Sequence, residues 1–266
     1  MGRKEEKVPR PLRIFSNSKI YHIILKGIDS QTIFYDDLDR KFFLKQISIT
    51  KNEFNYIVYA YCLMVNHVHL VIKCEDIFLS KAMQSLLVRY VSYFNRKYKR
   101  TGPLMQNRFK SKNIEYEKYF IDLCRYVHRN PEKAGISLTQ DYEWSSYKEY
   151  IGREKIINKD TLLYYFDNNI NEFIKNTLKT NDIEDLKEYV EYEMIEKLVD
   201  EQLIQYIIKK FNIDSVIDIP GFFKNKEKDE LGKILKEISN INGTNVTQVA
   251  RITRLGRRFI EKSWKN

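Results

Sequence analysis

Two histidines stand one residue apart in the segment Asn66-His67-Val68-His69. If this segment is a β-strand, both imidazoles project from the same face, because side chains two residues apart point the same way. Neutral imidazoles side by side on a rigid strand can bind a divalent metal ion. The same spacing also suits exposed or hydrogen-bonded histidines, so a second feature is needed to decide between them.

A tyrosine and an asparagine stand four residues apart further along the chain. On a helix, Tyr126 and Asn130 share one face and lie one turn apart. The tyrosine hydroxyl can act as an oxygen nucleophile, and the asparagine carbonyl can complete a metal site. The alternative is an ordinary one, since helical tyrosines mostly pack and an asparagine before a proline, here Pro131, often ends a helix.

Hydrophobic periodicity predicts the elements that hold these residues. Apolar side chains recur with helical spacing in three segments, and β-branched and aromatic runs mark the strands. The predicted strands are 21–26, 56–64, 67–73 and a fourth within the basic segment that ends at residue 113. The predicted helices are 37–50, 79–98 and 116–129, the last one ended by Asn130-Pro131.

The resulting order, βαββαβ followed by a helix, predicts an α+β fold of the ferredoxin-like type, an antiparallel sheet with helices on one face. Beyond residue 152 the chain is predicted to be all-helical. The stretch 182–201 carries nine acidic and two basic residues with helical periodicity, and we interpret it as the solvated face of a connecting helix. The predicted domains are 10–152, a partly acidic helical connection at 153–228, and a last region at 229–266.

The last region is predicted to form three short helices between residues 231 and 264. Their arrangement resembles a helix-turn-helix, whose last helix would enter a major groove of DNA. One departure is Arg254, which stands where such turns often carry glycine. Residues 251–266 include six basic side chains and one acidic one. A small basic helical cap is the alternative to a DNA-reading helix.

The whole chain has 266 residues, a formal net charge of +10 and 43% hydrophobic residues. Such a chain is long enough to bury a real core in one or two domains, which excludes a wholly disordered protein. The positive charge favours a polyanionic partner, either nucleic acid or an acidic membrane. No glycine-rich phosphate-binding motif occurs in the sequence.

Three cysteines, Cys62, Cys74 and Cys124, lie in apolar stretches and are predicted to be reduced and buried. The charged N-terminus lacks the apolar segment of a signal peptide. The longest apolar run, residues 57–65, is too short to cross a bilayer. These features predict a cytoplasmic protein with no membrane partner.

Five ordered blocks of the sequence resemble one family. Residues 64–72, which hold the histidine pair, are similar to the signature of the HUH single-tyrosine transposases, and more closely to the REP-associated tyrosine transposases. The other blocks are 21–27, 101–111, 126–135 and 144–147, in matching order across the predicted first domain. Val65 replaces the usual proline, and Met105 and Asn107 replace a more common phenylalanine and glycine. None of these changes removes a chemical group.

The resemblance implies a metal-dependent, single-strand DNA endonuclease and strand transferase, a transposase that acts beside DNA hairpins. It implies that His67, His69 and Asn130 hold one Mg²⁺ or Mn²⁺ ion. It also implies that Tyr126 attacks the scissile phosphate and forms a 5′-phosphotyrosine. A monomer and a homodimer are both compatible with a single tyrosine per chain.

Two clusters of cations are the predicted DNA contacts. The stretch 96–112 has seven basic residues and no acidic one, and would lie beside the tyrosine helix as a phosphate-contacting track. A solvated loop is the alternative. The predicted contacts are Arg96, Lys97, Lys99, Arg100, Arg108, Lys110, Lys112, Arg254, Arg257 and Arg258. Candidate cations that would assist the tyrosine are Arg125, His128 and Arg129, and no general base is assigned.

Two other functions compete with the transposase. A domesticated, non-catalytic DNA-binding regulator would need only the C-terminal helices, and the presence of both histidines, Tyr126 and Asn130 disfavours it. A zinc hydrolase is weaker still, because the sequence has four histidines and neither an HExxH nor a CxxC motif.

Overall fold

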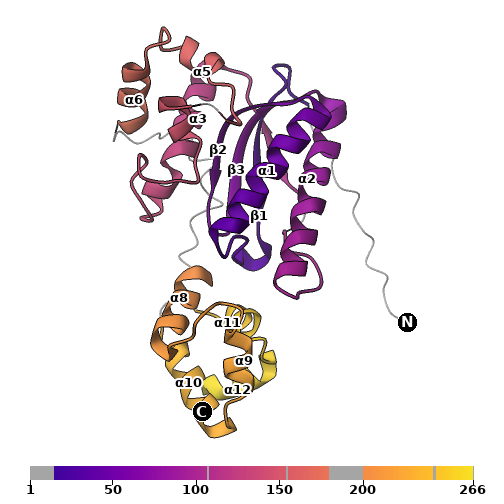
Figure 1. Cartoon of the computed structure of the whole chain (residues 1–266), viewed down its shortest axis with the longest axis vertical. Helices are drawn as coiled ribbons and strands as arrows, with labels where there is room; N and C mark the ends of the chain where they lie inside the picture. Colours follow the sequence, from indigo (N-terminus) through magenta and orange to yellow (C-terminus); the bar gives the residue numbers. More distant parts are fainter. Residues whose placement is uncertain (1–14, 107, 154, 180–199, 242–243, 266) are drawn as a thin grey trace, which may run out of the picture.

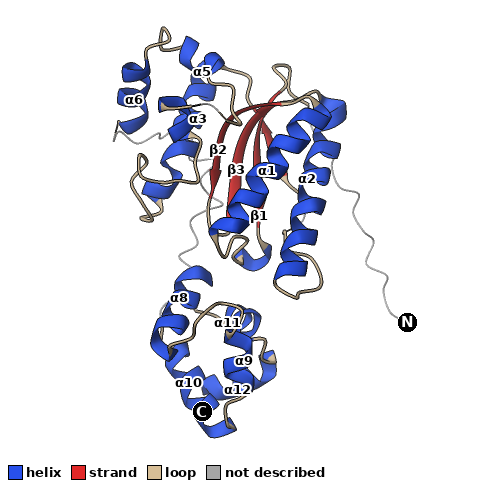
Figure 2. Ribbon diagram, viewed as in Figure 1, coloured by secondary structure: helices blue, strands red, loops and turns tan. Residues whose placement is uncertain are grey.

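The computed structural model describes residues 15–106, 108–153, 155–179, 200–241 and 244–265 of the chain. A region with a β-sheet comes first and an all-helical region follows it (Figures 1 and 2). The acidic stretch predicted to be helical at 182–201 lies outside the described residues, except for its last two positions. None of the described helices combines the length and the apolar character needed to cross a bilayer.

Four strands form one sheet in the order β2-β3-β1-β4, and every neighbouring pair is antiparallel. The predicted α+β class, the antiparallel sheet and the order of elements are confirmed. The bounds of the strands are Ile20–Lys26 for β1, Ile57–Leu63 for β2, His67–Lys73 for β3 and Lys110–Asn113 for β4.

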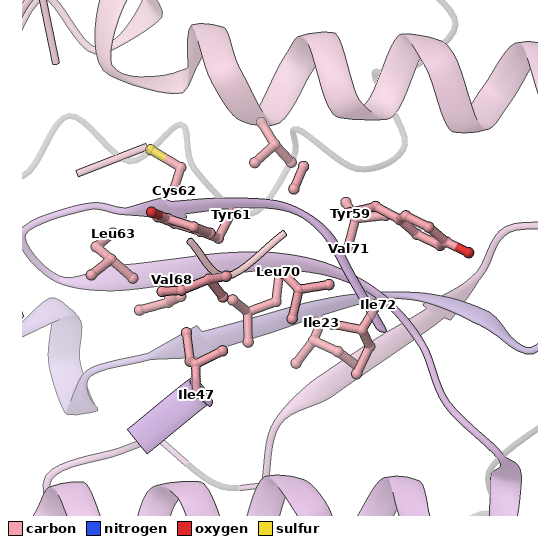
Figure 3. Packing of buried hydrophobic residues seen from close by; sticks show 14 of the residues in the cluster. Ile23, Ile47, Tyr59, Tyr61, Cys62, Leu63, Val68, Leu70, Val71 and Ile72 are labelled. Carbon is pink, nitrogen blue, oxygen red and sulfur yellow. The ribbon is translucent and has the colours of Figure 1, made fainter. Parts of the chain in front are cut away.

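Helices α1 (Asp37–Phe54) and α2 (Asp76–Lys97) pack on each other and cover one face of the sheet (Figure 1). The first helix begins with a capping box, in which the Asp36 side chain accepts from the Asp39 amide and Asp39 reaches back to the Asp36 amide. The apolar side chains between the sheet and these helices include Ile23, Ile47, Val68, Leu70 and Ile72 (Figure 3).

Helix α3 (Glu117–Lys133) covers the opposite face and contacts β2 and β3. The prediction of helices on one face only is therefore wrong. Strands β1 and β3 are buried on both faces: His22, His69 and Val71 are at most 1% exposed, as are the apolar side chains that alternate with them. A sheet face buried to this extent needs a covering element, which α3 supplies.

The predicted end of this helix at Asn130 is also wrong, because α3 continues through Pro131. A proline within a helix removes one backbone donor and crowds the carbonyl four residues earlier, yet the helix goes on past this one. The next turn is completed by Ala134 N, which donates to the Asn130 carbonyl at 3.0 Å. Asn130 is therefore helical and keeps its one-turn spacing from Tyr126.

Three short helices follow α3 and pack beside it (Figure 1). The chain between them and α3 also protects the edge of the sheet, because Leu63 N donates to the Trp144 carbonyl and Ser146 N donates to the Tyr61 carbonyl, both at 2.9 Å. An edge strand covered in this way cannot pair with another chain. The three helices are α4 (Tyr147–Ile151), α5 (Asp160–Tyr164) and α6 (Ile170–Leu178).

The C-terminal helices enclose a core of their own around Ile207, Leu235, Val249 and Ile260. The three short helices predicted at the end of the chain are confirmed. Arg254, which follows the second of them, has a left-handed backbone with φ of 59°. The helices of this region are α8 (Asp200–Phe211), α9 (Ile219–Lys224), α10 (Lys228–Ser239), α11 (Val246–Thr253) and α12 (Arg257–Lys265).

Candidate active site

The two histidines of β3 lie on the sheet face that α3 covers. Their ring centroids are 4.9 Å apart and the rings are perpendicular. His69 is 1% exposed and His67 is half-buried, while Val68 and Leu70 point into the core on the other face. The strand alternation therefore brings the imidazoles side by side, as the spacing predicts.

The hydrogen bonds of Asn66 fix the proton of His67. The Asn66 amide nitrogen donates to the Ser30 carbonyl at 3.4 Å, which turns Oδ1 toward His67 Nδ1, 2.6 Å away. Because an amide oxygen only accepts, Nδ1 of a neutral His67 carries the proton and Nε2 carries the lone pair. This is the tautomer that a metal ligand bound through Nε2 requires.

A third histidine, His22 of β1, plays the corresponding part for His69. His22 Nε2 lies 2.8 Å from His69 Nδ1, and the two rings stack with centroids 5.1 Å apart. His22 is fully buried. If His69 Nδ1 donates to His22, the lone pair of His69 is on Nε2, the nitrogen that faces α3. Ligand histidines commonly hold their other nitrogen in this way, and the partner fixes both tautomer and ring orientation.

Helix α3 brings Tyr126 and Asn130 onto the histidines. The Tyr126 ring meets the His69 ring edge to face, with centroids 5.7 Å apart, and the Asn130 amide nitrogen lies 3.5 Å from His69 Nε2. Tyr126 and Asn130 are 1% and 3% exposed. One chain thus places its tyrosine, its asparagine and both histidines at a single point between sheet and helix.

Lys133 is the cation that lies over the tyrosine. Its Nζ is 4.9 Å from the centroid of the Tyr126 ring. The two residues are seven apart in α3 and so share a face of the helix. The guanidinium groups suggested as helpers lie elsewhere, since Arg125 and Arg129 both donate to the Lys179 carbonyl beyond α6.

His128 is not a cation near the tyrosine, and that suggestion is wrong. Its ring is fully buried among Tyr147, Tyr150 and Phe173, and its Nε2 lies 2.9 Å from Ser146 Oγ. Burial lowers the pKa of His128 to about 3. The imidazole is therefore neutral at physiological pH, because a charged ring would lose its hydration without an opposite charge to replace it.

The donor chemistry of this site fits a divalent cation. When His67 and His69 direct their Nδ1 protons to Asn66 and His22, both carry a lone pair on Nε2, and rotation of the Asn130 amide exchanges its nitrogen for an oxygen donor. Two imidazoles and one amide oxygen suit Mn²⁺ better than Mg²⁺, which prefers oxygen ligands. Among the described residues no three His, Cys, Asp or Glu side chains form a metal-binding group.

Comparison with known proteins finds one matching family and one similar solved structure. Residues 16–130 match the model of the family described as "Transposase IS200 like". The chain contains an IS200-like transposase domain. A solved structure of a REP-associated tyrosine transposase bound to a REP hairpin is also similar, with 14% sequence identity and a TM-score of 0.48, over 55% of this chain and 87% of that one. No curated protein matches the chain.

The match takes in both histidines, Tyr126 and Asn130 within the IS200-like domain, and leaves the C-terminal helices outside it. His22 also lies within it. The sequence predicts no role for His22, because its contact with His69 depends on the pairing of two strands far apart in sequence.

Two predicted DNA contacts, Lys110 and Lys112, lie on the same sheet face as the histidines. In the strand pairing, Lys110 stands opposite Ile24, which stands opposite His69, and Lys112 stands opposite His22. Directly paired residues of antiparallel strands share a face, and strands lie about 4.8 Å apart, so these lysines are about 10 Å from the histidines of β3. They add positive charge beside the site.

The other half of the basic stretch lies elsewhere, so the single track predicted beside the tyrosine helix is wrong. Arg96, Lys97, Lys99 and Arg100 come at the end of α2, on the opposite side of the sheet. The sheet separates the two halves because α2 packs on one face, whereas Lys110 and Lys112 of β4 project from the other.

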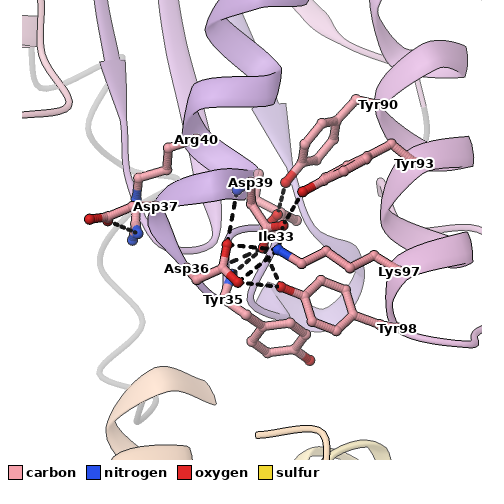
Figure 4. Close-up of polar contacts among 10 residues, drawn as sticks. All are labelled: Ile33, Tyr35, Asp36, Asp37, Asp39, Arg40, Tyr90, Tyr93, Lys97 and Tyr98. Atoms are coloured by element: carbon pink, nitrogen blue, oxygen red, sulfur yellow. Dashed lines mark hydrogen bonds and ion pairs between the residues drawn. The ribbon is translucent and has the colours of Figure 1, made fainter. Parts of the chain in front are cut away.

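Lys97 is part of a polar cluster that ties the start of α1 to the end of α2 (Figure 4). Its Nζ lies 2.7 Å from both Asp36 Oδ2 and Asp39 Oδ1, and Tyr98 donates to Asp39 at 2.8 Å. Asp39 is fully buried, and a buried carboxylate needs such partners. Hydrogen bonds to both carboxylates raise the pKa of Lys97 against the effect of its burial.

The remaining predicted contacts are exposed on the surface. Arg108 precedes β4, and Arg257 and Arg258 begin α12. Arg254 is exposed too, although its Nη2 donates to the Tyr98 carbonyl at 2.7 Å. Whether these side chains bind DNA stays a prediction.

Proposed function

We propose that the protein is a metal-dependent endonuclease and strand transferase that acts on single-stranded DNA through Tyr126. The observation that carries the proposal is the contact of Tyr126 and Asn130 with His69, inside a domain of a transposase family. The residues come from one chain, which supports catalysis within a monomer. A homodimer in which each copy uses its own site is equally compatible.

His67, His69 and Asn130 would hold one Mg²⁺ or Mn²⁺ ion. Such a cation, when bound, supplies Lewis-acid polarisation of a phosphate oxygen. Asn66 and His22 support the ligands from behind by holding the Nδ1 protons of the two histidines. The preorganised tautomers mean that no proton has to move within the sheet before the ion binds.

Tyr126 is the proposed nucleophile. Its hydroxyl oxygen forms a bond to the phosphorus, the bond from phosphorus to the 3′-oxygen breaks, the phenol gives up its proton, and the departing 3′-oxygen gains one. The products are a free 3′-hydroxyl and a 5′-phosphotyrosine. The ammonium group of Lys133 places positive charge beside the ring that must carry negative charge as the phenol is deprotonated.

The covalent phosphotyrosine keeps the phosphodiester bond energy within the protein. A later attack by the 3′-hydroxyl of another strand releases the tyrosine and joins the two strands, so no nucleotide cofactor is needed. Lys110 and Lys112 would bind backbone phosphates near this point. Single-stranded DNA beside a hairpin is the proposed substrate class, on the resemblance to the REP-associated tyrosine transposases.

A covalent adduct is the direct test. Hairpin oligonucleotides taken from the DNA that flanks the gene, labelled at either the 5′ or the 3′ end, would be incubated with the protein and Mn²⁺. We expect the strand 3′ of the cut to migrate with the protein on a denaturing gel, and Tyr126→Phe to remove the band. A matched control is Tyr116→Phe, because Tyr116 precedes the same helix and is 78% exposed.

Two outcomes would overturn the proposal. An undiminished adduct in Tyr126→Phe would show that another residue is the nucleophile. Tight binding of hairpins by the native protein, with metal present and no cleavage of any of them, would favour the non-catalytic DNA-binding regulator.

A further inference from the structure

The C-terminal helices meet the IS200-like domain where α2 ends. At this junction Thr32 N donates to the buried Asp200 carboxylate at 3.2 Å, and Arg254 donates to the Tyr98 carbonyl. A cavity of about 200 Å³ opens between the two regions, and a second of about 320 Å³ lies beside it. We call the two together the junction cleft. Its cations are Lys99, Arg100, Arg251, Arg254 and Arg257.

The positive charge of the junction cleft is only partly compensated. Arg251 forms a two-point ion pair with Asp200, with nitrogen–oxygen distances of 2.7 and 2.8 Å, so these two charges cancel. Asp29 is the acidic residue in the lining itself. The four other cations thus face one further carboxylate, and a cavity of this kind attracts an anion.

Arg100 is the residue that most clearly calls for an anionic ligand. It lines both cavities, its Nη2 donates to Gln31 at 3.2 Å, and its Nη1 is buried and has no hydrogen-bond partner among the described residues. Burial lowers the pKa of Arg100, and the nearby Arg251 and Arg254 act in the same direction. A guanidinium nevertheless stays charged, so a buried donor of this kind requires an acceptor.

We propose that the junction cleft binds backbone phosphates of the DNA substrate, with Arg100 of the IS200-like domain and Arg254 of the C-terminal helices gripping the strand from its two sides. Planar guanidinium groups match phosphate oxygens with paired hydrogen bonds. The inference rests on DNA binding by the proposed function and not on cleavage at Tyr126. It joins the cations at the end of α2 with those of the C-terminal helices in one shared contact, separate from Lys110 and Lys112 on the other face of the sheet.

The shape of the cleft favours a nucleic-acid strand over a small free phosphate. Lys99 and Arg254 line the first cavity and Arg257 lines the second, so the cations are spread along more than one phosphate position. The rings of Tyr35 and Tyr98 also line the first cavity, and they pack edge to face with centroids 4.8 Å apart. Both rings also pack against Phe94, so they form a fixed wall of the cavity.

Binding of a fluorescein-labelled, mixed-sequence single strand of about 30 nucleotides tests the proposal through its salt dependence. All proteins would carry Tyr126→Phe, so that cleavage does not interfere. We expect Arg100→Gln with Arg254→Gln to weaken binding roughly tenfold at low salt. The slope of log K against log salt should become less steep by about 0.7 for each phosphate that the variant no longer binds. The control is Arg89→Gln, which removes an exposed arginine paired with Glu53 on α1 and should change neither value.

Two further measurements separate binding from folding. Arg100→Lys with Arg254→Lys keeps the charge and should restore most of the slope, and thermal melting checks that each variant is folded. Phenylglyoxal modification followed by peptide mass spectrometry should show Arg254 of the native protein protected by the oligonucleotide and not by inorganic phosphate at equal phosphate concentration.

An unchanged slope in a folded double variant would overturn the proposal. Equal protection of Arg254 by inorganic phosphate would overturn it as well, in favour of a site for a free phosphate compound. These results are independent of the chemistry at Tyr126: a protein that binds DNA through the cleft but forms no covalent adduct upholds this inference and contradicts the proposed activity.

Discussion

Helices cover both faces of the sheet, but the two faces differ in chemistry. On the face under α1 and α2, the side chains of β3 are Val68, Leu70 and Ile72, all fully buried and apolar. On the face under α3, the same strand presents His67 and His69. Alternation along one strand thus assigns stability to one face and proposed chemistry to the other.

The comparison shows what a buried polar face requires. Apolar side chains need only close packing, whereas a buried imidazole loses hydration and must gain hydrogen-bond partners. Here the partners are Asn66 for His67, and His22 with Asn130 for His69. The same contacts that make burial tolerable also orient the imidazoles, so the arrangement that the proposed metal site needs follows from satisfying the polar groups.

Neighbouring substitutions on β3 give the largest expected contrast. His69→Ala removes a proposed metal ligand and is expected to slow adduct formation by about a thousandfold, in line with several kcal/mol of lost Lewis-acid catalysis. Leu70→Ala instead creates a cavity and should cost about 2–5 kcal/mol of unfolding free energy, with normal activity in the folded fraction. Adduct kinetics and chemical denaturation measure the two. A loss of activity from Leu70→Ala equal to that from His69→Ala would break the comparison.

His22 is expected to show an intermediate effect. His22→Phe keeps a ring but removes the acceptor for His69 Nδ1, and should raise the Mn²⁺ concentration for half-maximal adduct formation by about 10- to 100-fold. His22→Gln offers an amide oxygen in a similar place and should recover part of the loss. The measurement is a metal titration of adduct formation. A purely structural role would lower the melting temperature of His22→Phe and leave the metal requirement of the folded protein unchanged.

His128 is a buried histidine with no proposed role in catalysis, and its effect should appear in stability alone. Its pKa is about 3 in the folded protein against 6.5 ordinarily, so the unfolded chain binds the proton more readily. Its contribution to stability is complete above pH 6.5 and is lost as the pH falls toward 3, by up to about 1.4 kcal/mol per pH unit. Denaturation from pH 7 to 4 should therefore show a shallower decline for His128→Gln than for the native protein. Parallel declines would contradict a neutral His128.

The smallest expected effect concerns the basic edge of the sheet face under α3. Lys112→Gln removes one proposed phosphate contact and should weaken single-strand binding severalfold, with a salt slope less steep by about 0.7. Lys41→Gln, an exposed lysine of α1 on the other side of the sheet, serves as the control. Anisotropy titrations measure both. Equal effects of the two substitutions would show that binding follows net charge and not the face of the sheet.

Most of the fold and the central residues of the site could be predicted from local patterns in the sequence. The spacing of His67 and His69 and that of Tyr126 and Asn130 each describe one face of one element, so both could be predicted. That the two pairs lie in contact could not be predicted from their spacing, because it depends on how α3 packs on the sheet. Only the resemblance to a family predicted it.

What depends on contacts between distant segments was missed. His22 meets His69 only through strand register, and His128 is neutral only because α4 and α6 bury it. The stretch 96–112 reads as one basic run, yet the fold sends its two halves to opposite sides of the sheet. Pro131 signals a helix end, but α3 packs on the sheet and continues to Lys133.

The identity of the residue that becomes linked to DNA tests the proposed role of Tyr126 most directly. After reaction with a hairpin oligonucleotide and Mn²⁺, the adduct would be trimmed with nuclease, digested with protease and sequenced by tandem mass spectrometry. The proposed mechanism predicts a 5′-phosphonucleotide on Tyr126. A nucleotide on any other residue, or none on a protein that has cleaved its substrate, would contradict it.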